Sequence, residues 1–327
     1  MDEWLRVREH LRANRYRLAA EAASRYPDIP TLAGTPLLTR PEWVPGRPVP
    51  LADLAIALVP TPPAPTLPAG PVPAGYPRYS AAMAALDAPA VFENRPTYRL
   101  LSASLLDRRL EFGHGTYFTG IDVGEAAAHE LAAGGPTPLR DAVGDPTVLR
   151  GRPANLAISA LTIRAGARRT FFLHWRDPAK VGHAGGLYQV LPVGVFQASG
   201  PSPEDFSLWN FMLREYAEEL LGEPERTAVD YASWPFAARM SAALRDGLIR
   251  AHCLGLGVDP LTFATDLLVS VVIDAPVFDD LFGTVVAVNE EGSVSEQPFT
   301  AETIENLPMQ AAGAALVHRA LHLLAED

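Results

Sequence analysis

The sequence predicts an α+β fold, in which a mixed sheet is flanked by helices and preceded by a smaller α+β region. Two observations lead to this fold class. Beyond residue 150, apolar segments follow one another as strand, loop, strand, helix, strand and helix, without the regular alternation of β/α units that builds a doubly wound sheet. A length of 327 residues also leaves room for more than one packed region.

The first expected element is an N-terminal helix over residues 1–26. Apolar side chains recur at near-helical spacing from Trp4 to Ala22, and Pro27 ends the pattern. Arginines alternate with acidic residues along this segment, and we interpret them as a solvated helix face rather than as a DNA or membrane contact. These arginines are Arg6, Arg8, Arg12, Arg15 and Arg17.

Residues 27–79 come next and hold about half of the 31 prolines. Because proline lacks the N–H that an interior strand needs, we expect an extended segment, which either wraps the neighbouring regions or links them. Residues 80–150 then predict a small α+β region. Its expected elements are a helix at 80–87, strands at 98–107 and 110–121, and a helix at 124–134.

Residues 151–327 predict the main domain. Its β-branched run from Leu267 to Ile273 is expected at the centre of the sheet. The helix that contains Glu215 is expected to pack on one face of that sheet. The expected strands are 154–165, 168–177, 188–198 and 265–275, and the expected helices are 205–222 and 309–325.

Composition and charge exclude several classes of protein. The net charge of -11 argues against a large nucleic-acid footprint. No uninterrupted apolar run reaches the roughly 18 residues of a membrane span. Cys253, the only cysteine, excludes a disulfide framework and a multi-cysteine zinc site, and its apolar neighbours indicate a buried, inert thiol. Because the first residues are charged and lack an apolar core, we expect no secretory signal and a cytoplasmic location.

The segment with the clearest chemistry is the acidic stretch of the helix at 205–222. Offsets of three and four residues place Glu215, Glu218 and Glu219 within about 100° on one face. Like charges at these spacings destabilise a helix by a few tenths of a kcal/mol per pair, so the cluster calls for another explanation. Mg²⁺ prefers oxygen ligands and shares its shell with water and phosphate, which makes this face a candidate metal site. We expect the side chains of Glu218 and Glu219 to be partly exposed.

The run Arg-Glu-x-x-Glu-Glu at residues 214–219 resembles the signature of the Nudix hydrolase superfamily. The resemblance covers about 175 residues. Before the run lie a strand, a glycine-containing loop and the turn Leu-Pro-Val-Gly, and after it the stretch SEQPFTAETIENLP is similar to the strand-to-helix step that ends a Nudix domain.

The resemblance implies site residues and a cofactor. Glu215, Glu218 and Glu219 would be ligands of Mg²⁺ or Mn²⁺, and the last two would also be catalytic. Arg214 would orient a glutamate, Gly194 would match the loop glycine at the substrate, and Gly222 would close the helix. The loop glutamate of the family falls on Gly200, for which Glu204 or Asp205 are substitutes.

Further candidates lie outside this helix. Lys180, in the loop before the motif, is either a phosphate contact or an ordinary exposed charge. Another carboxylate of the site could come from the group Glu290, Glu291 and Glu296. His318 and His322 share a helix face but lack the accompanying glutamate of a metal motif, and we interpret them as exposed.

Two functions follow. The first is metal-dependent hydrolysis of a nucleoside diphosphate-linked or related diphosphate substrate. The alternative is a sensor that binds a nucleotide or sugar phosphate without turnover and reports through the N-terminal region. The expected partner is a small phosphorylated molecule. Neither a membrane nor a nucleic acid is expected, and a homodimer is left open.

Overall fold

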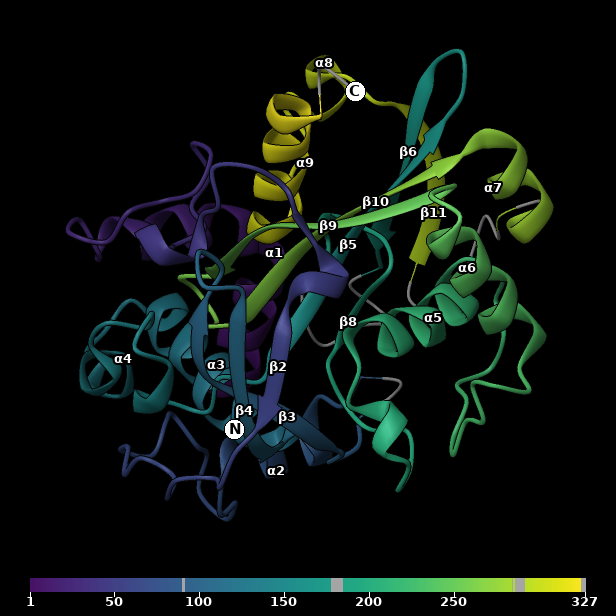
Figure 1. The fold of residues 1–327 in the computed structure, drawn as a ribbon. Helices are drawn as coiled ribbons and strands as arrows, with labels where there is room; N and C mark the ends of the chain where they lie inside the picture. Colours follow the sequence, from purple (N-terminus) through teal and green to yellow (C-terminus); the bar gives the residue numbers. More distant parts are fainter. Residues whose placement is uncertain (90–91, 178–184, 284, 286–291, 325–327) are drawn as a thin grey trace.

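The computed structural model describes residues 1–89, 92–177, 185–283, 285 and 292–324, and its larger sheet is mixed. The central strand β10 (Thr265–Asp274) runs parallel to β5 (Leu156–Ala165) and antiparallel to β9 (Ile249–Val258) (Figure 1). The central place expected for Leu267 to Ile273 is therefore confirmed. The remaining strands of this sheet are β1 (Val49–Pro50), β6 (Arg169–Arg176), β7 (Tyr188–Val190), β8 (Val193–Val195) and β11 (Gly292–Pro298).

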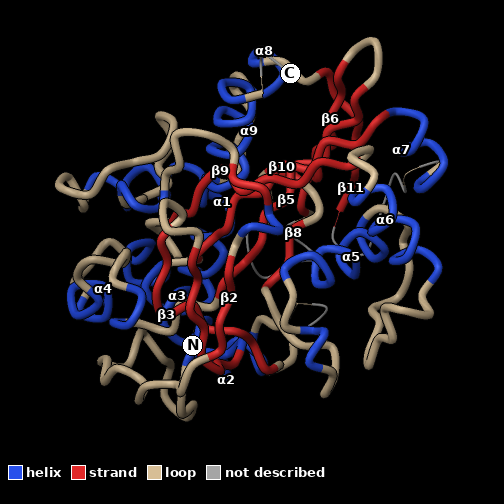
Figure 2. Tube along the Cα trace, viewed as in Figure 1, coloured by secondary structure: helices blue, strands red, loops and turns tan. Residues whose placement is uncertain are grey.

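Helices cover both faces of this sheet (Figure 2). Side chains alternate along β10, so that Val269 and Val271 face one layer while Leu268 and Val272 face the other. The first layer contains α5 (Leu208–Glu219), α6 (Pro235–Arg245) and α7 (Ala275–Phe282), and the second contains α9 (Ala311–Leu323), which follows the short α8 (Ala301–Ile304). The predicted mixed sheet flanked by helices is confirmed.

The N-terminal region is the predicted α+β part. A sheet of β2 (Ala55–Leu58), β4 (Arg109–Thr116) and β3 (Pro96–Ser104) lies beside four helices. These are α1 (Asp2–Ser24), α2 (Tyr79–Leu86), α3 (Tyr117–Ala133) and α4 (Pro138–Val143). Gly134 adopts φ 71° at the end of α3, as expected for the residue that stops a helix. Side chains before and after residue 150 pack into one cluster, and the expected boundary there stays a prediction.

Two expected strands have different limits in the structure. The strand expected to reach residue 121 ends at Thr116, because Tyr117 already begins α3. The strand expected over 188–198 is two short strands, β7 and β8, with Leu191 and Pro192 between them. They pair with different partners, β6 and β5, and Pro192 has no N–H with which to continue a ladder. The apolar strand β9 was not predicted.

Residues 27–78 of the proline-rich segment contain no α-helix, as their composition predicted, and they contribute a strand to each sheet. It is anchored by buried side chains, including Leu37, Leu38 and Trp43. Its short strands β1 and β2 lie at the edges of the two sheets, where an absent proline N–H does not interrupt a central ladder. Several 3₁₀ turns complete the chain, at Pro41–Trp43, Leu51–Asp53, Leu149–Gly151 and Pro203–Asp205.

The arginines of α1 correct one expectation. Arg8 and Arg15 are buried rather than solvated, with 0% and 3% of their surface exposed. Both donate hydrogen bonds to the carboxylate of Glu125 on α3, and Arg8 also pairs with Asp87. A buried guanidinium needs such a partner, and the partners come from segments about a hundred residues away in sequence. Only Arg6 and Arg17 of this row lie exposed.

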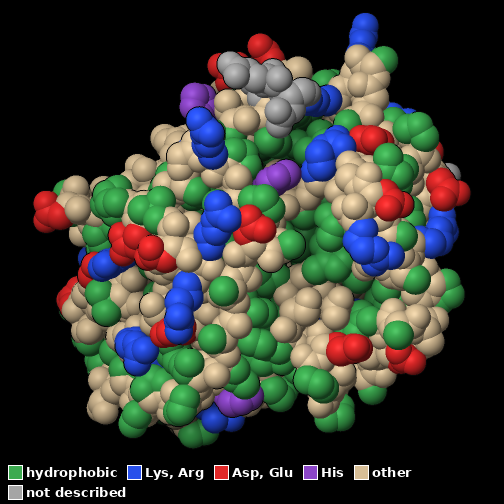
Figure 3. Space-filling model, in the orientation of Figure 1, with side chains coloured by type: hydrophobic (Ala, Val, Ile, Leu, Met, Phe, Trp, Pro, Cys, Tyr) green, Lys and Arg blue, Asp and Glu red, His purple; other side chains and the backbone are tan. Residues whose placement is uncertain are grey.

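On the face in Figure 3, acidic and basic side chains are interspersed. Among the described residues, no helix is both long enough and apolar enough to cross a membrane.

Candidate functional site

The acidic helix α5 is held against the sheet by its apolar face. Ser207 caps its first turn by accepting a hydrogen bond from the N–H of Asn210. Phe211 and Tyr216 are fully buried, and the Tyr216 hydroxyl lies 2.9 Å from the hydroxyl of Thr162 on β5. This contact fixes the rotation of α5, because a helix with Tyr216 pointing inward presents its glutamates toward β8 and the solvent edge.

The three glutamates differ in burial. Glu218 is exposed, Glu215 is half-buried, and Glu219 is only 6% exposed. The Glu219 carboxylate accepts a 2.8 Å hydrogen bond from the N–H of Val193 on β8. The expectation that Glu218 and Glu219 would be partly exposed is therefore wrong for Glu219, because the β8 backbone supplies a donor that periodicity could not reveal.

Gly194 on β8 lies directly against Glu215. A Cβ at this position would overlap the Glu215 carboxylate and come within 2.8 Å of the Phe211 ring. A glycine is therefore needed here for space. Gly194, which was predicted to contact substrate, thus lies beside the candidate metal ligand Glu215. Gly222, with φ 69°, ends the helix as expected, and its N–H returns to the carbonyl of Glu218.

Arg214 contacts the loop before α5. Its guanidinium donates a 2.7 Å hydrogen bond to the carbonyl of Gln197 and lies 5.4 Å from the centre of the Phe211 ring. Within the described part of the chain it donates to no glutamate, which corrects the expected orienting contact. Burial raises the pKa of the nearby Tyr231 to about 12, and the positive charge of Arg214 opposes this shift. Through its hydrogen bond to the carbonyl of Gln197, Arg214 stabilises the loop before α5.

Asp205, one substitute for the loop glutamate, has a structural role. It is fully buried and accepts hydrogen bonds from the backbone N–H of Ser199 and Gly200, the Ser199 hydroxyl and the Tyr231 hydroxyl. With both oxygens engaged, it holds the loop that leads into α5. Glu204 beside it is exposed.

His174 and Gln189 are the polar residues that sequence reasoning missed. They face each other across the β6–β7 pair and are 0% and 3% exposed. The His174 Nδ1 lies 3.7 Å from a carboxylate oxygen of Glu219. Among the residues that the structure describes, neither His174 ring nitrogen nor the amide nitrogen of Gln189 has a hydrogen-bond partner. The alternation of the strand at 168–177 was the available signal, because it places His174 on the same face as the buried Phe172.

Several other candidates do not join this group. Lys180, Glu290 and Glu291 lie outside the described residues. Glu296 is exposed on β11 and accepts a hydrogen bond from the Thr170 hydroxyl.

His318 and His322 are exposed on α9, which is the expected arrangement. Cys253 is buried in β9, and burial raises the pKa of its thiol to about 12, so that the reactive thiolate is suppressed at neutral pH.

No protein-family model matches the chain, and no curated protein does. Solved Nudix structures are similar to part of it. The NUDIX domain of Shewanella oneidensis NrtR, in complex with ADP ribose, covers 52% of this chain and 88% of its own, with 15% identity and a TM-score of 0.32. A mutT/nudix family protein from Listeria innocua covers 53% and 94%, with 16% identity and a TM-score of 0.33.

A NUDIX hydrolase from Alicyclobacillus acidocaldarius covers 50% of this chain and 89% of its own, with 17% identity and a TM-score of 0.30. The Shewanella protein has also been solved with a 27mer DNA. Over about half its length the chain is thus similar to Nudix domains.

Proposed function

We propose that the protein is a Nudix-type hydrolase of a nucleoside diphosphate-linked or related diphosphate substrate, with its site on the outer face of α5. The observation that supports this proposal most is that the three glutamates differ in burial. Glu219 is anchored to β8, Glu215 lies against Gly194, and Glu218 is exposed, where a charged substrate can reach it.

The residues of this face could hold a divalent cation through two carboxylates, although they do not form a larger cluster of ligands. Among the described residues, no group of three or more His, Cys, Asp or Glu side chains is arranged to hold a metal ion. Mg²⁺, however, commonly binds through only one or two carboxylates and completes its shell with water and substrate phosphates. Glu215 and Glu218 would be those carboxylates. When bound, Mg²⁺ or Mn²⁺ would supply charge neutralisation at the diphosphate and acidify a water.

The protein's own residues would set the position and the proton chemistry of the site. Glu219, held by the Val193 N–H, would keep α5 in register with β8. Glu218 would accept the proton of the attacking water, because it is the exposed carboxylate of the three. Arg214 would act indirectly, through the loop that it braces at Gln197.

The alternative function, a sensor that binds a nucleotide or sugar phosphate without turnover, is favoured by a different observation. Glu219, one of the three candidate ligands, is buried and hydrogen-bonded to backbone. A site in which only two carboxylates remain near the surface could hold a phosphorylated ligand and lack the full set of groups for hydrolysis.

A substrate screen separates the two functions. The protein is incubated with a panel of nucleoside diphosphate derivatives and either Mg²⁺ or Mn²⁺, and phosphate is measured after treatment with a phosphatase. Metal-dependent release of phosphate supports the hydrolase. If no compound turns over, although one of them raises the melting temperature in the presence of metal, the hydrolase is rejected and the sensor is supported.

A further inference from the structure

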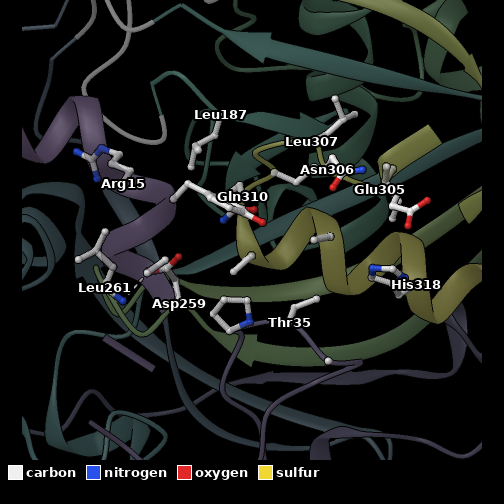
Figure 4. A pocket seen from close by; sticks show the side chains of 18 of the residues that line it. Arg15, Thr35, Leu187, Asp259, Leu261, Glu305, Asn306, Leu307, Gln310 and His318 are labelled. Carbon is white, nitrogen blue, oxygen red and sulfur yellow. Dashed lines mark hydrogen bonds between the residues drawn. The ribbon is translucent and has the colours of Figure 1, made fainter. Parts of the chain in front are cut away.

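A cavity of about 470 Å³ lies on the α9 side of the large sheet, and α5 contributes none of its lining. Its walls come from α1, the loop at 34–36, the turn after β9 and the segment that leads into α9. Figure 4 shows Asp259 and Leu261 on one side, Gln310 at the start of α9, and Glu305 and Asn306 toward the other side. The volume lies within the range typical of small-molecule sites, roughly 300–1,000 Å³.

Asp259 presents one unused oxygen at this cavity. The side chain is only 7% exposed, and its Oδ1 accepts hydrogen bonds of 2.8 and 2.9 Å from the N–H groups of Leu261 and Thr262. No described residue donates to the other oxygen. This oxygen is therefore open to the cavity, where a charged donor on a ligand would form a charge-assisted hydrogen bond with it.

Gln310 presents an unused donor. It is 5% exposed, and its Oε1 caps α9 by accepting a hydrogen bond from the N–H of Gly313 at 3.1 Å. Its amide nitrogen donates to no described residue. The cavity thus has an acceptor at Asp259 and a donor at Gln310, and each side chain is fixed by a hydrogen bond to backbone through its other atom.

The turn that carries Asp259 is braced from behind. Arg140 donates to the carbonyls of Pro260 and Leu261, and Arg152 donates to the carbonyl of Phe263. Gly124 of α3 packs so closely on the turn that a Cβ there would overlap the carbonyl of Thr262. A carboxylate held in this way is preorganised, which is the property expected of a binding residue.

The charge at the cavity favours a cation. Asp259, Glu302 and Glu305 contribute carboxylates to the lining. Arg15 also lines it, and both terminal nitrogens of its guanidinium donate to Glu125. The rest of the wall is largely apolar and includes Leu187, Leu261, Ile304, Met309 and Ala311.

We propose that this cavity binds an organic amine with an apolar body, whose ammonium group donates to Asp259 and whose acceptor, where present, faces Gln310. The apolar body would fill the space along the first turns of α9. The site is separate from the candidate site on α5, and the proposal does not depend on hydrolysis.

Three probes with one indole body test the charge preference: tryptamine, tryptophol and indole-3-propionate. Titration calorimetry and ligand-detected NMR on the full chain should show that tryptamine binds at least tenfold more tightly than indole-3-propionate, with tryptophol between them. Equal affinity for the amine and the carboxylate would overturn the proposal.

Variants then locate the binding. Asp259→Asn keeps the acceptor for the Leu261 and Thr262 N–H groups and removes the charge, so tryptamine affinity should fall at least tenfold. Asp246→Asn, an exposed change outside the cavity, should leave it within twofold.

If Asp259→Asn does not fold, Ala314→Leu serves in its place, because it narrows the cavity from the α9 side. Tryptamine that binds Ala314→Leu as tightly as the parent protein would place the amine elsewhere and end the proposal.

Discussion

Two helices of this protein carry like charges at helical spacing, and the structure treats them in opposite ways. On α1, Arg8 and Arg15 point inward and share Glu125. On α5, the glutamates range from the buried Glu219 to the exposed Glu218. The difference shows that the role of a charged helix face depends on the groups that it contacts. A row that meets an opposite charge becomes part of the core, and one that meets solvent can hold a ligand.

The largest expected effect tests the α5 side of this comparison. Glu218→Gln should reduce turnover of a substrate found in the screen by roughly 10²- to 10⁴-fold, the usual contribution of a positioned base. The free energy of unfolding should change by less than about 0.5 kcal/mol, because the side chain is exposed. Steady-state rates and urea melts measure the two quantities. Glu9→Gln, an exposed change on α1, is the matched control, and equal rates for both variants would remove Glu218 from the mechanism.

Changes to the buried ion pairs of α1 should lower the free energy of unfolding. Glu125→Gln leaves Arg8 and Arg15 buried without their shared carboxylate, and removal of one partner of a buried ion pair costs about 3–5 kcal/mol. Urea denaturation followed by circular dichroism gives the value. The control is Glu21→Gln, which breaks the exposed pair with Arg17 and should cost less than about 1 kcal/mol. Similar losses for both would contradict the distinction between buried and exposed charges.

His129, packed against the same buried network, adds a pH dependence. Burial, and then the charge of Arg8, lowers its pKa to about 4. Because the unfolded value is about 6.5, the unfolded chain binds the proton first as the pH falls. The stabilisation is therefore complete above about pH 6.5 and is lost toward pH 4, with a steepest slope of about 1.4 kcal/mol per pH unit.

Unfolding free energies measured between pH 7 and pH 4 test this slope. His129→Gln should flatten the profile in that window, whereas His10→Gln, an exposed change on α1, should leave it unchanged. A profile that keeps its slope without His129 would assign the dependence to other groups.

The smallest expected effect concerns the contact between β8 and α5. Gly194→Ala places a methyl group against the Glu215 carboxylate and the Phe211 ring, and overpacking of this kind costs about 1–3 kcal/mol. Gly46→Ala is the control, because an added Cβ there meets no atom within 4 Å. Thermal melts of the two variants compare them. A Gly194→Ala protein as stable as the control would show that Glu215 moves aside freely.

The sequence by itself determined the elements whose signal is local. The period of α5, the β-branched run of β10, the glycine at 134 and the prolines of 27–79 each specify a backbone conformation through neighbouring residues. From these came the α+β class, the central strand and the helix that carries the glutamates.

Tertiary structure decided which polar groups are buried and what they meet. Arg15 is buried because Glu125 lies beside it, 110 residues away in sequence. Glu219 is anchored by the Val193 backbone, and folding brings its carboxylate within 3.7 Å of His174 on β6. The cavity at Asp259 needs α1, β9 and α9 together. No periodic pattern in the sequence reveals these contacts, because the burial of a polar group depends on segments that only folding brings together.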